Sequence, residues 1–88
     1  MGQVAVLFRL MPQGVETDLQ KIGERIPSVL PSGVTIRGMQ IKDIAYGLKS
    51  LLVAAVMNDT GGVLESTEEA LAKIPGVESV EVMEEGLL

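Results

Sequence analysis

The sequence predicts an α+β sandwich in which two helices cover one face of a four-stranded antiparallel-type sheet. Hydrophobic residues alternate along four short segments, as in β-strands, and recur at helical spacing along two others. The segments follow the order strand, helix, strand, strand, helix, strand, which is the split βαβ arrangement of ferredoxin-like folds. With 88 residues and no linker or low-complexity tract, we expect one domain spanning residues 1–88.

The first strand is expected over residues 3–11, because alternate positions there are apolar and fall on one face. These positions are Val4, Val6, Phe8 and Leu10. Pro12, Gln13 and Gly14 follow and end the strand.

A helix is expected next. Thr17 is suited to the N-cap, and Gln20 follows three residues later, as in a capping box. Pro27 lies inside the helical pattern, and proline lacks an N–H and crowds the carbonyl of Gly23. We therefore expect either a kink or a helix end near Ile26. The hydrophobic residues at helical spacing are Leu19, Ile22, Ile26 and Leu30.

The second strand is expected over about 34–45 and the third over about 48–57. Alternation in the second strand shifts phase between Ile36 and Met39, so Gly38 is a plausible site for a β-bulge. The third strand is apolar on both faces, which is typical of a central strand. The first and third strands should therefore be the central pair. Three of their side chains should be deeply buried: Val6, Leu52 and Val53.

A turn over residues 58–62 leads into the second helix, whose apolar stripe is Val63, Thr67, Ala70, Leu71 and Ile74. Pro75-Gly76 stops this helix, and a short last strand is expected over 77–83, with Val80 and Val82 pointing inward. Since two helices cover only one face of the sheet, the other face should remain partly apolar. Such a face usually meets a partner.

The composition removes most catalytic chemistry. The chain has no cysteine and no histidine, so thiol catalysis, disulfides and the commonest general base and metal ligand are absent. No pair of carboxylates can be placed across a cleft, so hydrolase chemistry has no support. We expect no enzyme, no cofactor and no metal site.

The charge argues against nucleic acid and membrane partners. The formal net charge is −5, and the seven Lys and Arg residues form no cluster in the sequence, which disfavours direct nucleic-acid binding. The longest apolar run, residues 51–57, is too short to span a bilayer, and no signal peptide is visible. We expect a soluble cytoplasmic protein.

The segment Tyr46-Gly47-Leu48-Lys49 joins the second and third strands. One interpretation places the Tyr46 ring in the core and Gly47 in the bend. The other exposes the ring at the strand end as a hydrophobic plug for a partner's pocket, a role for which tyrosine is favoured. The residues alone leave both interpretations open.

Several short motifs occur in an order and spacing that resemble the archaeal elongation factor 1-beta family over essentially the whole chain. They are Met11-Pro12, Asp18-Leu19, Ile44-Ala45-Tyr46-Gly47-Leu48-Lys49, the Gly61-Gly62 turn before an acidic helix, and Gly76-Val77-Glu78-Ser79-Val80. The resemblance implies a guanine-nucleotide exchange factor that binds the GTPase elongation factor 1-alpha. It would promote GDP release so that GTP can rebind during polypeptide elongation, without covalent chemistry or a cofactor.

The resemblance also implies where the partner binds. It points to the hairpin segment, Tyr46, Gly47, Leu48 and Lys49, and to the tail, Gly86, Leu87 and Leu88. In eukaryotic relatives a penultimate lysine approaches the magnesium site of the GTPase. Here Leu87 stands in that place, and no Lys or Arg follows Lys73, so magnesium must be displaced in another way. We expect the tail to act as an apolar wedge.

Other interpretations rest on the fold alone. A regulatory small-ligand-binding module with this topology would pair edge to edge as a dimer and be stabilised by its ligand. A structural module without a site of its own is a third interpretation. We favour the exchange factor, acting as a monomer.

Overall fold

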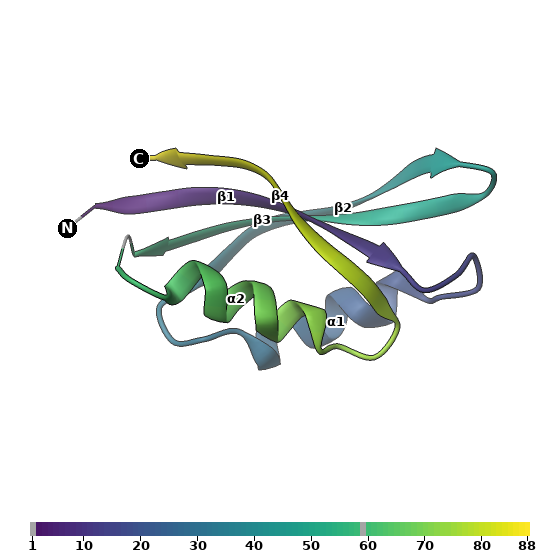
Figure 1. Ribbon diagram of the computed structural model, residues 1–88, viewed down its shortest axis with the longest axis horizontal. Coiled ribbons are helices and arrows are strands. Elements are labelled where there is room, and N and C mark those ends of the chain that lie inside the picture. The colour runs from purple at the N-terminus through teal and green to yellow at the C-terminus, as the bar shows by residue number, and fades with distance from the viewer. Residues whose placement is uncertain (1, 59) are drawn as a thin grey trace.

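The computed structural model describes residues 2–58 and 60–88. Its elements are β1 (Gln3–Pro12), α1 (Leu19–Val29), β2 (Thr35–Ala45), β3 (Leu48–Asn58), α2 (Val63–Ala72) and β4 (Val77–Leu87). The strands form one antiparallel sheet in the order β2-β3-β1-β4, and both helices lie on one side of it (Figure 1). The predicted ferredoxin-like α+β fold is confirmed, with the first and third strands in the centre.

The hydrophobic core lies between the sheet and the two helices. The alternating side chains of β1 all face it, and Phe8 and Leu10 are completely buried. Thr67 of α2 is also completely buried, and its hydroxyl donates a hydrogen bond of 2.8 Å to the carbonyl oxygen of Val63. The helical side chains that complete the core include Leu19, Ile22, Ile26 and Leu71.

The start of α1 differs from the prediction. Asp18, not Thr17, is the N-cap, and its carboxylate accepts hydrogen bonds from the backbone N–H groups of Gln20 and Lys21 at 3.1 and 3.2 Å. The Thr17 hydroxyl instead accepts from the N–H of Gly14. The helix also does not end near Ile26 but continues through Pro27 to Val29.

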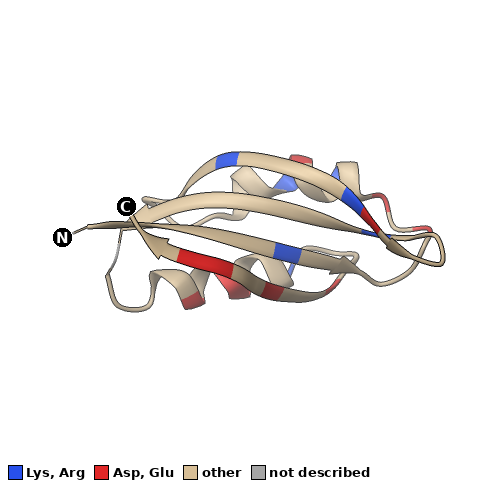
Figure 2. Cartoon of the chain, turned by 90° about the horizontal axis from the view of Figure 1, so that it is seen from above, with Lys and Arg blue, Asp and Glu red and all other residues tan. Residues whose placement is uncertain are grey.

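The face of the sheet away from the helices is not covered by any other part of the described chain (Figure 2). We call it the open face. Strand alternation, register and the lining of one surface hollow assign to it side chains that include Ala5, Leu7, Arg9, Thr35, Arg37, Gln40, Leu52, Ala54, Val56, Glu81 and Glu84. The predicted deep burial is confirmed for Val6 and Val53 but wrong for Leu52, which is only partly buried. Leu52 points to the open face, where no second layer packs against it.

All irregularities of the sheet lie in its two edge strands. Pairing with the central strands leaves one extra residue in β2 at Arg37, beside Gly38 as predicted, and another at Ile44. In β4 the extra residues are Glu78 and Met83. Such bulges interrupt the regular ladder that an edge strand would otherwise offer to another strand.

The last strand is longer than predicted. β4 extends beyond Met83 to Leu87, because residues 84–87 continue to pair with the first half of β1. The Leu88 N–H adds a hydrogen bond of 2.9 Å to the Gln3 carbonyl oxygen. Of the two valines predicted to point inward, Val80 packs against the core, whereas Val82 remains 36% exposed at the edge of the sheet.

Candidate partner-binding site

A two-residue turn carries the only tyrosine of the chain. Ala45, the last residue of β2, pairs with Leu48, the first residue of β3, so Tyr46 and Gly47 alone form the loop. Both have positive φ, 54° and 79°, which is the requirement of a type I′ hairpin turn. Glycine meets this requirement freely, but a tyrosine there is strained by roughly 1 kcal/mol or more.

The turn holds the Tyr46 ring away from the rest of the protein. Its relative exposure is 101%, so the ring is as accessible as in an extended peptide. This outcome removes the interpretation that placed Tyr46 in the core. A stiff aromatic ring held in solvent by a strained turn has the form of a hydrophobic plug.

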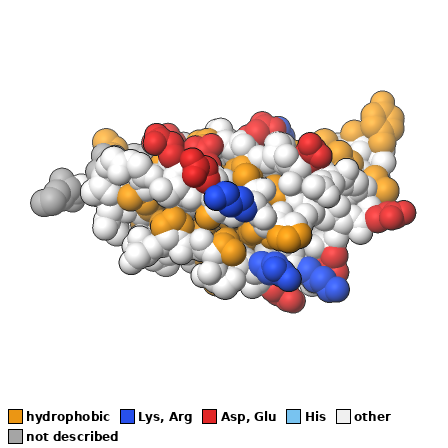
Figure 3. Space-filling view, turned by 60° about the horizontal axis from the view of Figure 1, so that its bottom comes forward, with side chains coloured by type: hydrophobic (Ala, Val, Ile, Leu, Met, Phe, Trp, Pro, Cys, Tyr) orange, Lys and Arg blue, Asp and Glu red, His pale blue; other side chains and the backbone are white. Residues whose placement is uncertain are grey.

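The hairpin projects because its strands are longer than the helices that cover them. β2 and β3 each have 11 residues, which span roughly 36 Å, whereas the 11 residues of α1 span only about 16 Å. The end of the hairpin therefore keeps apolar side chains in solvent, as the helix side of the molecule shows at its right-hand end (Figure 3). Ile41 and Ile44, on the strand that leads into the turn, are both 43% exposed.

The other predicted hairpin residues support this tip. Leu48 is partly buried, and Gly47 supplies the second positive φ. The Lys49 ammonium lies 4.0 Å from a carboxylate oxygen of Asp43, its direct cross-strand neighbour. Both side chains are largely exposed, so this pair adds little stability and leaves Lys49 accessible.

The predicted tail residues lie at the opposite end of the molecule. Gly86 and Leu87 pair with Ala5 and Val4 at the start of β1, while the hairpin tip lies beyond the other end of the sheet (Figure 1). At about 3.3 Å per residue along β3, the two segments are on the order of 30 Å apart. Leu87 and Leu88 are 74% and 71% exposed, so this end is also apolar.

The structure adds features that the sequence did not assign. Ile41 and Ile44 belong to the tip, and the only signal for them was the phase shift of alternation in β2. On the open face, the Arg9 guanidinium contacts both carboxylate oxygens of Glu81, at 2.9 and 3.1 Å. Arg9 alternates with the core-facing Phe8 and Leu10, so its face follows from the strand pattern, but its partner is 72 residues away and no local pattern indicates it.

No cluster of metal-binding side chains is found in the described part of the chain. Across residues 2–58 and 60–88, no three carboxylates converge as metal ligands would. None of the helices in these two ranges is long and apolar enough to cross a membrane.

Comparison with known proteins supplies the functional context. The family model of the EF-1 guanine nucleotide exchange domain matches residues 5–87, which include both the hairpin and β4. Elongation factor 1-beta of Methanococcoides burtonii is 46% identical over 86 residues, 98% of this chain and 97% of that protein. Elongation factor 1-beta of Archaeoglobus fulgidus is 42% identical over the full length of both chains.

Among solved structures, the C-terminal domain of the MgtC protein from Mycobacterium tuberculosis is similar. Its TM-score is 0.59, and the match covers 99% of this chain and 88% of that one. The sequence identity is 19%, so this likeness shows a shared fold alone.

Proposed function

Because this chain belongs to the family of the EF-1 guanine nucleotide exchange domain, and so acts in nucleotide exchange during translation elongation, we propose that its partner is elongation factor 1-alpha. In this proposal the chain promotes the release of GDP from that GTPase, and GTP then rebinds. The family match also favours exchange over the small-ligand-binding module with the same topology.

The observation that carries the proposal is the full exposure of Tyr46 on a strained turn. An exchange factor must bind the nucleotide-free GTPase more tightly than the loaded one, and linkage requires it to weaken nucleotide binding by the same factor. A protruding ring that enters a pocket only when the GTPase has rearranged provides such a difference. Ile41 and Ile44 would add apolar contacts around the ring.

The tail, at the end of the molecule opposite the hairpin, is the second proposed contact with the GTPase. If the hairpin and the tail both bind, they contact regions of the GTPase on the order of 30 Å apart, and the stiff sheet keeps that separation constant. Leu87 and Leu88 would act as an apolar wedge, with Gly86 allowing close approach. Lys49 would mainly speed association through its charge.

Nothing in this mechanism requires covalent chemistry. Binding energy displaces the segments of the GTPase that hold phosphate and magnesium, so the proposed activity needs no nucleophile, cofactor or metal of the chain's own. We place this activity in the cytoplasm, where elongation occurs, without direct contact to nucleic acid or membrane.

The experiment is release of fluorescent GDP from purified elongation factor 1-alpha, with and without this chain. The wild-type chain should accelerate release, and Tyr46→Ala should lose most of the acceleration while remaining folded. Met83→Ala is the matched control, because Met83 is an exposed apolar side chain away from both ends. Release that is no faster with the wild-type chain would refute the proposal.

A further inference from the structure

The side chains of the open face are arranged in rows across the four strands. Strand register aligns each residue of β1 with one residue of β3 on one side and one of β4 on the other. From β2 to β4, the rows are Thr35, Val56, Ala5 and Gly86; then Arg37-Gly38, Ala54, Leu7 and Glu84; then Gln40, Leu52, Arg9 and Glu81.

In two of the three rows, a large side chain lies beside a small one in the centre of this face. Val56 lies beside Ala5, and in the next row Ala54 lies beside Leu7, so the larger residue changes strand. A two-fold axis parallel to the strands, between β3 and β1, would place Leu7 over Ala54 of a second copy and Val56 over its Ala5. In these two rows large residues would then face small ones, which is the condition for two surfaces to interdigitate. In the third row Arg9 would lie over Leu52 of the other copy, so the close contact is in the first two rows.

Opposite charges on the two edge strands are complementary about the same two-fold axis. Arg37 on β2 and Glu84 on β4 lie at opposite ends of one row, and neither makes an ion pair within the described part of the chain. Together with Ala5, Leu7 and Ala54 they line a hollow of about 410 Å³. The two-fold axis places each Arg37 over the Glu84 of the other copy.

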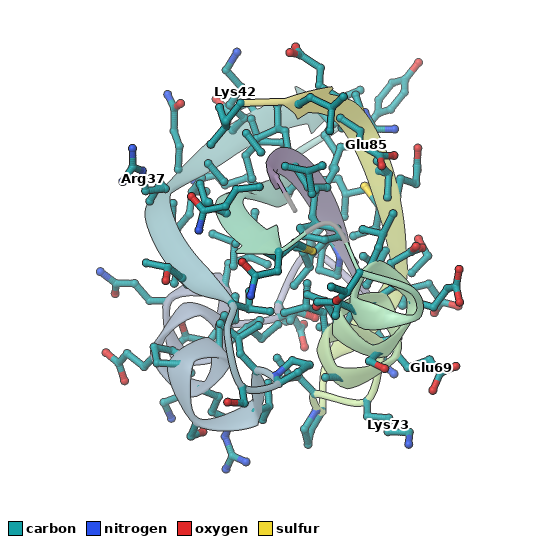
Figure 4. All side chains as sticks on the ribbon, turned by 90° about the vertical axis from the view of Figure 1, so that its left-hand side faces the viewer. Arg37, Lys42, Glu69, Lys73 and Glu85 are labelled. Carbon is teal, nitrogen blue, oxygen red and sulfur yellow. The ribbon has the colours of Figure 1, made fainter. Side chains whose placement is uncertain are left out.

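The edges of the sheet are less suited to self-association than its face. Each edge strand carries two bulges, Arg37 and Ile44 in β2 and Glu78 and Met83 in β4. An edge-to-edge dimer would need a continuous ladder of backbone hydrogen bonds through these positions. Figures 2 and 4 show basic residues on β2 and acidic residues on β4, at opposite sides of the sheet.

We propose that the open face binds a second copy of this chain, face to face about this two-fold axis. Four strands and three rows cover roughly 19 by 20 Å, or on the order of 400 Å² per copy, about half of a standard interface. The dimer is therefore weak and forms only at high protein concentration. Because the axis is parallel to the strands, both hairpin tips point the same way and both Tyr46 rings stay exposed.

The experiment is sedimentation equilibrium of the full chain over a range of concentrations up to about 1 mM. The wild-type protein should pass from monomer to dimer mass. Arg37→Glu and Glu84→Arg should each weaken association about tenfold, because each replaces two attractive contacts by two repulsive ones. The double variant, which keeps the net charge of the wild type, should associate within about threefold of it. If a charge reversal disturbs folding, Arg37→Ala and Glu84→Ala replace it, and each should also weaken association.

The control is Glu69→Arg, which changes the charge as Glu84→Arg does but on α2, in the layer away from the open face (Figure 4). This variant should associate like the wild type. Three results would overturn the proposal: a monomer at every concentration, single reversals that associate like the wild type, or a double variant that stays as weak as the singles. Nucleotide exchange does not enter this measurement, so its outcome is independent of the proposed function.

Discussion

Phe8 and Tyr46, the only aromatic residues of the chain, lie at opposite extremes of exposure: the Phe8 ring is completely buried, and the Tyr46 ring is completely exposed. A small core gains roughly 1.5–3 kcal/mol from burying one large apolar side chain. The chain gains this from Phe8 and forgoes it at Tyr46, where the turn adds strain as well. Loss of stability at an exposed position is typical of residues that serve function.

Replacing Tyr46 by asparagine should separate stability from function. Asparagine suits positive φ and is favoured before glycine in type I′ turns, so Tyr46→Asn should raise the free energy of unfolding by about 1 kcal/mol. The same variant should slow GDP release, because the ring is lost. Denaturant unfolding and nucleotide release would check both. A less stable variant with normal exchange would mean that the ring supports the fold.

Leu51 and Leu52 provide a matched pair for the two faces of the sheet. Leu51 is 3% exposed and faces the helices, while Leu52 is partly buried on the open face. Leu51→Ala should lower the free energy of unfolding by roughly 2–5 kcal/mol, and Leu52→Ala by less than half of that. Equal losses in denaturant unfolding would show that the open face is covered in solution.

The tail can be tested without disturbing β4. Deleting residues 86–88 would also remove backbone pairing with β1, so substitution is the sharper test. Leu87→Ser combined with Leu88→Ser keeps the backbone bonds, and it should reduce GDP release several-fold with little change in stability. Neutralising Glu84 and Glu85 with glutamine should reduce release less. Undiminished release by the leucine variant would leave Tyr46 as the proposed contact.

The N-cap of α1 can be tested at a single position. Asp18→Ala removes the acceptor for two backbone N–H groups and should lower the free energy of unfolding by about 1 kcal/mol. Asp18→Ser should retain most of the stability, because serine is also a good N-cap. If thermal unfolding shows that Asp18→Ala and Asp18→Ser are equally destabilised, the N-cap hydrogen bonds are not the cause of the lost stability.

Local patterns were enough to predict the elements and their order. Alternation identified β1 because Val4, Val6, Phe8 and Leu10 face a core that covers only one side of the sheet. Local patterns did not predict the end of β4. The sequence Glu84-Glu85-Gly86 has low strand propensity, and β1 supplies the pairing partners from the far end of the chain.

The candidate site was only partly predicted, because it too depends on strand pairing and packing that local patterns do not reveal. The sequence showed a tyrosine in a tight connection, but two interpretations remained until the pairing of Ala45 with Leu48 defined a two-residue loop. Leu52 was misjudged because a strand that is apolar on both faces looks central and buried. Its burial depends on a second layer of structure, which the order of strands and helices alone does not reveal.

The exposed ring of Tyr46 also determines how this protein absorbs near-ultraviolet light. With one tyrosine and no tryptophan, that signal comes almost entirely from a single phenol group. The group is in water when the chain is folded and in water when it is unfolded, so near-ultraviolet spectra hardly register the loss of the fold. Transfer of the same ring into a partner's apolar pocket would change them. In this protein the tyrosine spectrum therefore responds to binding of a partner at Tyr46 and hardly changes when the chain unfolds.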